Sequence, residues 1–150
     1  MLVAAGATIA VATLGALVTD LGPWYQALHM PPWKPPDWAF GPIWTLVFGT
    51  AMLAGLAAWK ARPTPLYRGR LLALFLVNAL LNIAWSVLFF RLHRPDWAFG
   101  EVLLFWLSIA ALVAMAGRAS RAAAALLLPY LVWVSVAACL NLAIVRLNPP

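Results

Sequence analysis

Five long stretches of apolar residues, separated by short polar segments, divide this 150-residue chain. Each is close to the ~20 residues that a helix needs to cross the hydrocarbon core of a bilayer. None alternates apolar and polar residues with a period of two, so membrane-spanning strands are not indicated. The pattern therefore predicts an all-α integral membrane protein, a five-transmembrane-helix bundle. The expected helices cover residues 2–21, 42–59, 69–90, 97–116 and 122–146 of a single domain, residues 1–150.

The composition agrees with a membrane protein. Hydrophobic residues make up 65% of the chain and charged residues 9%, whereas about a quarter of a soluble domain is charged. Mean hydropathy is +0.92. The net charge of +6 arises between the apolar stretches, where basic residues face lipid headgroups rather than nucleic acid. Six lysines and arginines fall in loops on the N-terminal side and four on the other, which favours a cytoplasmic N-terminus.

The connection between the first two stretches, residues 24–44, has an unusual composition. It reads WYQALHMPPWKPPDWAFGPIW and holds four tryptophans and five prolines. Proline fixes φ and lacks an N–H, so this segment cannot be one continuous helix. Tryptophan suits a membrane–water interface or the cover of an apolar pocket. The segment is therefore predicted to be a stiff surface rather than a slack linker.

The hexapeptide PDWAFG occurs twice, at residues 36–41 and 95–100. Each copy opens an apolar stretch, the second and the fourth, so five helices would place both copies on one membrane face. The motif is interpreted as a helix start, with Asp as N-cap and Trp as interfacial anchor. A duplicated fold is the alternative, but the rest of the two halves does not match.

Polar and aromatic residues recur at helical spacing within three of the stretches. An amide in hydrocarbon needs partners, so these faces should point into the bundle or into a cavity. Two interpretations stay open at this point, helix–helix hydrogen bonding and contact with a ligand. The faces comprise Trp44, Phe48 and Met52, then Asn78, Asn82, Trp85 and Phe89, and finally Tyr130, Trp133, Ala137, Leu140 and Asn141.

Ionisable residues offer no familiar catalytic constellation. Glu101 is the only carboxylate well inside an apolar stretch, and we expect a structural role, with snorkelling or pairing to Arg91 or Arg94. His29 and His93 lie in loops without a metal-ligand partner at suitable spacing, so no metal site is predicted. No phosphate loop or C-x-x-C is present. An aromatic, slightly polar bundle suits a flat, mostly apolar ligand held by stacking and a few hydrogen bonds.

Several short motifs, in order along nearly the whole chain, carry a family resemblance. The chain resembles the TspO/MBR family of translocator proteins and tryptophan-rich sensory proteins, once called peripheral-type benzodiazepine receptors. The matching segments are Trp24–Tyr25, Trp33-Lys-Pro-Pro with Trp38, Pro42-Ile-Trp44, Asn78-x-x-x-Asn82-x-x-Trp85, Pro129-Tyr-Leu-x-Trp133, Ala137 and Leu140–Asn141.

The resemblance implies a ligand and a set of binding residues. Family members form five-helix bundles, often homodimers, and bind porphyrins such as protoporphyrin IX under the first long loop. No cofactor is obligatory in this picture, since the tetrapyrrole is the ligand. By position, pocket residues would be Trp44, Phe48, Asn78 and Trp133, flanking residues Ile43, Ala137 and Leu140, and loop residues Trp33 and Trp38; Asn82 and Trp85 join them from the polar face.

Three functions follow as expectations. The first is a tetrapyrrole receptor, sensor or transporter-like protein; the second is a light- or oxidant-dependent porphyrin-degrading enzyme that uses Trp44 and Trp133. The third is a pigment-linked structural subunit of a larger membrane complex. Leu142 and Ala143 replace the tyrosine of the cholesterol-recognition motif of animal members, so sterol binding by that route is doubtful. A bacterial-type member in a bacterial cell membrane is expected, with lipids and a second copy of the chain as partners.

Overall fold

The computed structural model describes residues 2–149, with side chains left undescribed at residues 2–5, 7–9 and 12. Helices are the only regular structure of residues 2–149, and each of the five apolar stretches forms a long helix. A five-residue helix and one turn of π-helix complete the fold. The elements are α1 Leu2–Val18, α2 Pro23–Ala27, α3 Asp37–Ala61, α4 Pro65–Ser86, η1 Val87–Arg91, α5 Pro95–Gly117 and α6 Arg121–Leu147.

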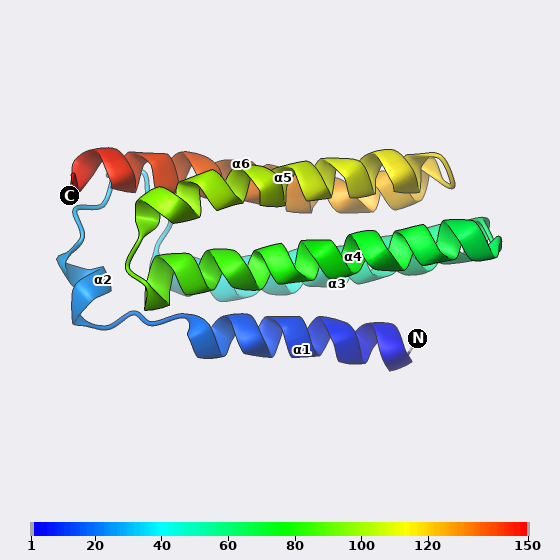
Figure 1. The fold of residues 1–150 in the computed structure, drawn as a ribbon, viewed down its shortest axis with the longest axis horizontal. Helices are drawn as coiled ribbons and strands as arrows, with labels where there is room; N and C mark the ends of the chain where they lie inside the picture. Colours follow the sequence, from blue (N-terminus) through cyan, green and yellow to red (C-terminus); the bar gives the residue numbers. More distant parts are fainter. Residues whose placement is uncertain (1, 150) are drawn as a thin grey trace.

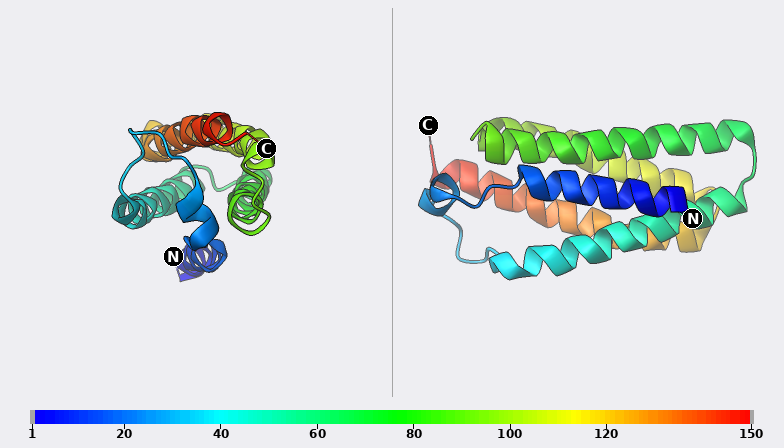
Figure 2. Two further views of the ribbon diagram at one scale, coloured as in Figure 1. Left: turned by 90° about the vertical axis from the view of Figure 1, so that its left-hand side faces the viewer. Right: turned by 90° about the horizontal axis from the view of Figure 1, so that it is seen from below.

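The five long helices run side by side along one axis, with the two termini at opposite ends (Figure 1). Helices α5 and α6 form one side of the bundle, and α3 and α4 flank them (Figure 2). Helices α3 and α4 make few contacts with each other, and α1 packs against both of them. Helix α1 thus closes the gap between α3 and α4. The connection from α1 to α3, including α2, crosses one end of the bundle (Figure 2). The helices therefore surround a central space that this connection covers at one end.

The prediction of an all-α membrane protein is confirmed at the level of its long helices. Four segments, 37–61, 65–91, 95–117 and 121–147, are long and apolar enough to cross a membrane. The first helix, α1, is shorter, with 17 residues. Large apolar side chains are exposed on the outer faces of the long helices, as lipid contact requires. They include Leu72, Leu76 and Leu80 on α4 and Leu103, Leu104 and Leu107 on α5.

Two predicted details of the helix starts are wrong. Helix α3 begins at Asp37 rather than at Pro42, which lies inside the helix. Pro42 has no N–H to donate to the Trp38 carbonyl, so α3 lacks that backbone hydrogen bond near its start. The residues at the N-cap positions are Pro36 and Arg94, and neither caps with its side chain. Asp37 and Asp96 instead lie in the first turn, where a carboxylate complements the positive helix end.

The remaining boundaries shift by a few residues. The first helix ends at Val18 instead of residue 21, and the third predicted span begins at Pro65 instead of residue 69. Its last turn is a π-helix, η1, in which Leu92 N–H donates to Val87 C=O. The wider turn buries both neighbouring aromatic residues, Phe89 and Phe90. Both PDWAFG copies do open helices at the same end of the bundle, as predicted (Figure 1).

The tryptophan- and proline-rich connection is fixed to the rest of the bundle at two distant points. The His29 N–H donates to Asn148 Oδ1 over 2.9 Å, and Asn148 Nδ2 donates back to the His29 carbonyl over 3.0 Å. The ring of Trp24 stacks on His93, with 4.1 Å between centroids. These contacts tie residues 24–29 to the end of α6 and to the turn before α5.

Candidate functional site

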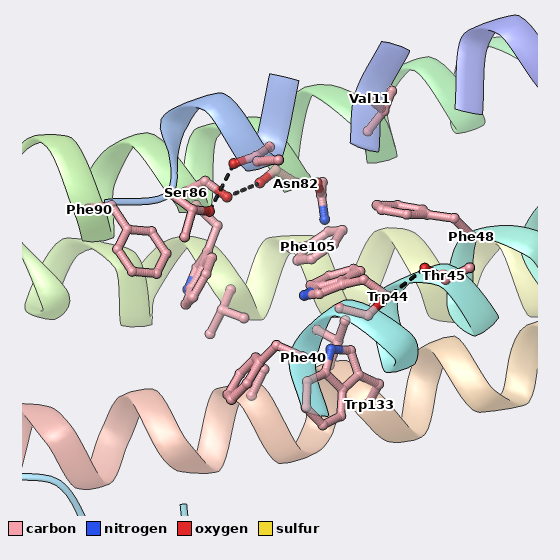
Figure 3. A pocket seen from close by; sticks show the side chains of 18 of the residues that line it. Val11, Phe40, Trp44, Thr45, Phe48, Asn82, Ser86, Phe90, Phe105 and Trp133 are labelled. Carbon is pink, nitrogen blue, oxygen red and sulfur yellow. Dashed lines mark hydrogen bonds between the residues drawn. The ribbon is translucent and has the colours of Figure 1, made fainter. Parts of the chain in front are cut away.

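A cavity of about 850 Å³ lies in the central space, bounded by all five long helices. Its volume falls within the roughly 300–1,000 Å³ typical of small-molecule sites. Aromatic side chains make up much of the wall that α3 to α6 provide, and small side chains make up the wall that α1 provides (Figure 3). The aromatic residues are Phe40, Trp44, Phe48, Trp85, Phe90, Phe105 and Trp133; on the other side are Val11, Gly15 and Ala16 of α1 and Thr19, the residue that follows α1.

Two tryptophans set the shape of the aromatic wall. Trp44 stacks on Phe48 with centroids 5.1 Å apart and an interplanar angle of 26°. Trp133 stands almost perpendicular to Trp44, at 6.4 Å and 89°. The four-residue spacing puts Trp44 and Phe48 on one face of α3. The result is a flat surface with a second aromatic edge against it, a geometry suited to a planar ring.

The indole N–H of Trp133 has no hydrogen-bond partner among the described residues, although its Nε1 is buried. The residue is 9% exposed and lines the cavity (Figure 3). The indole of Trp85, in contrast, donates to Asn141 Oδ1 over 3.0 Å. Asn141 Nδ2 in turn donates to the Pro95 carbonyl over 2.8 Å. The Trp85 N–H is thus engaged, whereas the buried N–H of Trp133, another cavity-lining residue, has no partner among the described residues.

The two asparagines of α4 have different surroundings. Asn78 Nδ2 donates to Ser108 Oγ over 2.8 Å, and its Oδ1 accepts from the Tyr130 hydroxyl at 3.0 Å. Those bonds join α4 to α5 and α6, and Asn78 is absent from the cavity lining. Asn82, one turn further on, does line the cavity, and its side chain points toward Phe105 (Figure 3). Asn78 therefore forms hydrogen bonds between helices, whereas Asn82 lines the cavity.

The cavity brings together six of the eleven predicted ligand residues, namely Trp44, Phe48, Asn82, Trp85, Trp133 and Ala137. The other five do not line it. Trp33 and Trp38 are 51% and 76% exposed, and Ile43 and Leu140 pack into apolar clusters. Contact of any of these residues with a ligand stays a prediction.

Sequence reasoning missed the contribution of α1. Val11, Gly15 and Ala16 of α1, with Thr19 directly after it, line the cavity, but small residues in an apolar stretch are equally common where helices merely pack. It also missed Phe105, although Glu101 and Ser108 lie four residues before it and three residues after it, on the same face of α5. For the first apolar stretch, the one available clue to a cavity-lining face was the i, i+4, i+8 spacing of residues 11, 15 and 19.

A polar cluster formed by Tyr25, Lys34 and Asp37 lies at the loop end of the cavity. Lys34 Nζ bonds to Asp37 Oδ1 and, over 3.2 Å, to the Tyr25 hydroxyl. The same hydroxyl donates to Asp37 Oδ1 over 3.1 Å. Burial raises the pKa of Tyr25. Burial alone would lower the pKa of Lys34, but the hydrogen bonds to Asp37 and Tyr25 outweigh it and raise that pKa. Lys34 is therefore a cation, and Tyr25 a neutral donor, at neutral pH.

The expected pairing of Glu101 with Arg91 or Arg94 is wrong. Arg91 donates to the Leu17 carbonyl over 2.7 Å, at the C-terminal end of α1, and Arg94 bonds to Asp96 over 2.8 Å. Both arginines thus satisfy nearer acceptors. Neither carboxyl oxygen of Glu101 has a partner among residues 2–149, and both are buried.

Fold and cavity together define a multi-pass, all-α integral membrane protein with an aromatic chamber inside its bundle. The chain belongs to the TspO/MBR family, whose sequence model matches residues 4–147. It is 38% identical over 130 residues to the tryptophan-rich protein TspO of Chlorobaculum tepidum, covering 84% of this chain and 80% of that one. Its identity to the translocator protein of Ovis aries is 39% over 128 residues, covering 79% and 70%. Protein CrtK of Rhodobacter capsulatus is 33% identical over 150 residues, covering 97% and 86%.

Proposed function

We propose that this chain is a five-span receptor, sensor or transporter-like protein that binds protoporphyrin IX or a related tetrapyrrole in the cavity. The observation that carries the proposal is the wall formed by Trp44, Phe48 and Trp133, with one buried indole N–H left unpartnered. Helix α1 would be the fifth span, because 17 residues extend about 26 Å and lie alongside the other helices (Figure 1).

In the proposed complex the planar ring lies against Trp44 and Phe48, and Trp133 donates to an acceptor on the ligand. A buried donor without a partner costs about 1–3 kcal/mol. A ligand acceptor at this position relieves that cost, so the N–H favours ligands that combine a flat apolar body with acceptor atoms. Names such as sensory protein and translocator protein among the relatives support this class of function.

The partners stay predictions of the same proposal. A second copy of the chain, in a bacterial cell membrane, is expected from the family resemblance. Sterol binding by the cholesterol-recognition motif near the end of α6 is not expected, since Leu142 and Ala143 hold the tyrosine positions.

Quenching of tryptophan fluorescence by protoporphyrin IX tests the proposal on the purified, detergent-solubilised protein. Trp133→Phe keeps an aromatic ring but removes the N–H, so we expect the dissociation constant to rise about tenfold. The corresponding loss of binding free energy lies within the range of about 1–3 kcal/mol given above. Trp97→Phe is the matched control, because Trp97 is 56% exposed and outside the cavity lining. Equal affinities of the two variants and wild type would refute the proposed ligand contact.

A second candidate function, photo-oxidative porphyrin degradation, draws on one observation. Trp44 and Trp133 are oxidisable rings 6.4 Å apart in the same cavity. Under illumination in air, the Soret band of added porphyrin should then decay faster with wild type than with Trp133→Phe, at ligand concentrations that saturate both. Equal decay would leave binding as the better description.

A further inference from the structure

The cavity is apolar along most of its length, and its ionisable groups gather at one end. Among the described residues that line it, the only titratable ones are Tyr25 and Asp37, both at the loop end. Met52 lies fifteen residues further along α3, roughly 22 Å away along the helix axis. A charged group buried without a partner is costly. Any charged part of a ligand is therefore directed to the loop end.

Lys34 supplies a cation at that end. An ammonium group has three N–H donors, of which two are directed at Tyr25 and Asp37. The Lys34 side chain is 16% exposed, and its Nζ lies 5.5 Å from the Tyr25 ring centroid and 5.9 Å from that of Phe40. Lys34 is not itself a lining residue, but Tyr25, Asp37 and Phe40 are, so these contacts hold the ammonium next to the cavity wall with one N–H donor left for a further acceptor.

Two other cations of the loop end, Arg91 and Arg94, are already engaged. Arg91 donates to the Leu17 carbonyl, and Arg94 is bonded to Asp96. Lys34 is also bonded to a carboxylate, but Asp37 is 54% exposed and can rotate away into water. Helix α3 starts at this point, and its positive N-terminal end adds to the attraction for an anion.

We propose that Lys34, together with the Tyr25 hydroxyl, binds a carboxylate at the edge of the ligand, and that Asp37 is its counter-ion in the free protein. This inference rests on the proposed function and deepens it. The ligand class is a planar apolar molecule with an acidic edge, oriented with its acid toward the loop end and its apolar edge toward Met52. A cationic ligand edge is disfavoured, because it would meet the Lys34 ammonium at Asp37.

Two ligands that differ only in charge test the inference on the full chain. Protoporphyrin IX carries two carboxylates, and its dimethyl ester carries none. For Lys34→Met we expect about tenfold weaker binding of the free acid and unchanged binding of the ester, since a charge-assisted hydrogen bond is lost. Lys60→Met is the control, because Lys60 lies in the last turn of α3, at the opposite end of the bundle, and should affect neither ligand.

Asp37→Asn gives an independent reading that a merely structural ion pair would not produce. Removing the competing carboxylate should tighten binding of the free acid severalfold and leave the ester unchanged. The inference is overturned if Lys34→Met weakens both ligands equally, if it weakens neither, or if Asp37→Asn weakens the free acid. Failure of wild type to bind either ligand would instead refute the proposed function itself.

Discussion

Replacing Asn78 by leucine tests whether this residue holds helices together rather than holding the ligand. Asn78 is 5% exposed, accepts from the Tyr130 hydroxyl and donates to Ser108. Asn78→Leu removes two interhelical hydrogen bonds, each worth about 0.6 kcal/mol in a membrane protein. It also leaves the hydroxyl of Tyr130, which is 2% exposed, without its acceptor, at a cost of about 1–3 kcal/mol. Together these effects should lower the free energy of unfolding by about 2–4 kcal/mol.

A double variant separates the lost bonds from the orphaned hydroxyl. Removing both partners of a buried hydrogen bond is nearly neutral, whereas removing one is not. Tyr130→Phe in the Asn78→Leu background should therefore recover about 1–3 kcal/mol. Ser108 keeps its own bond to the Phe105 carbonyl in every variant.

The assay is unfolding by SDS in mixed micelles, followed by circular dichroism, for wild type, both single variants and the double variant. Protoporphyrin IX affinity is measured on the same four proteins. Strictly additive destabilisation would refute the hydrogen-bonding role. A large loss of affinity in the double variant, with its stability recovered, would assign Asn78 to ligand contact.

Two further predictions concern groups outside the cavity. Asn148→Ala removes the side-chain hydrogen bonds between Asn148 and His29, so local opening of the connection should become about 1–2 kcal/mol easier. Hydrogen exchange of residues 25–30 should accelerate, while exchange in the middle of α5 stays unchanged. Unchanged exchange of residues 25–30 would contradict this tie. Glu101→Leu removes a carboxyl group whose two oxygens are buried and have no partner among the described residues. The free energy of unfolding should therefore rise by about 1–3 kcal/mol. A fall would mean that Glu101 has a favourable partner beyond the described residues.

The helices could be predicted from sequence because hydrophobicity over ~20 residues depends only on composition. Their ends could not, because proline has two outcomes near a helix start. At Pro35 and Pro36 it precedes the helix, and at Pro42 it lies within it. Both outcomes occur within one short segment, so the presence of proline alone does not fix the first helical residue.

The aromatic half of the cavity could be predicted, because Trp44 and Phe48 lie four residues apart in one apolar stretch and Trp133 and Ala137 lie four residues apart in another. The distinction between Asn78 and Asn82 could not. Residues four apart share a helical face, so only the positions of Ser108 and Tyr130 on other helices decide which amide is bonded. The position of the Lys34 ammonium at the loop end could not be predicted, for a related reason. Lys34 reaches Tyr25 only through the path of an irregular segment.

Occupation of the cavity by the ligand is the central claim, and filling the cavity tests it most directly. Gly49 lines the cavity, and a Cβ atom there would meet nothing within 4 Å. Gly69 has equally open surroundings but lies outside the lining. Protoporphyrin IX should bind Gly49→Trp at least about tenfold more weakly than wild type, and Gly69→Trp with unchanged affinity. Equal affinities of all three proteins would contradict the account.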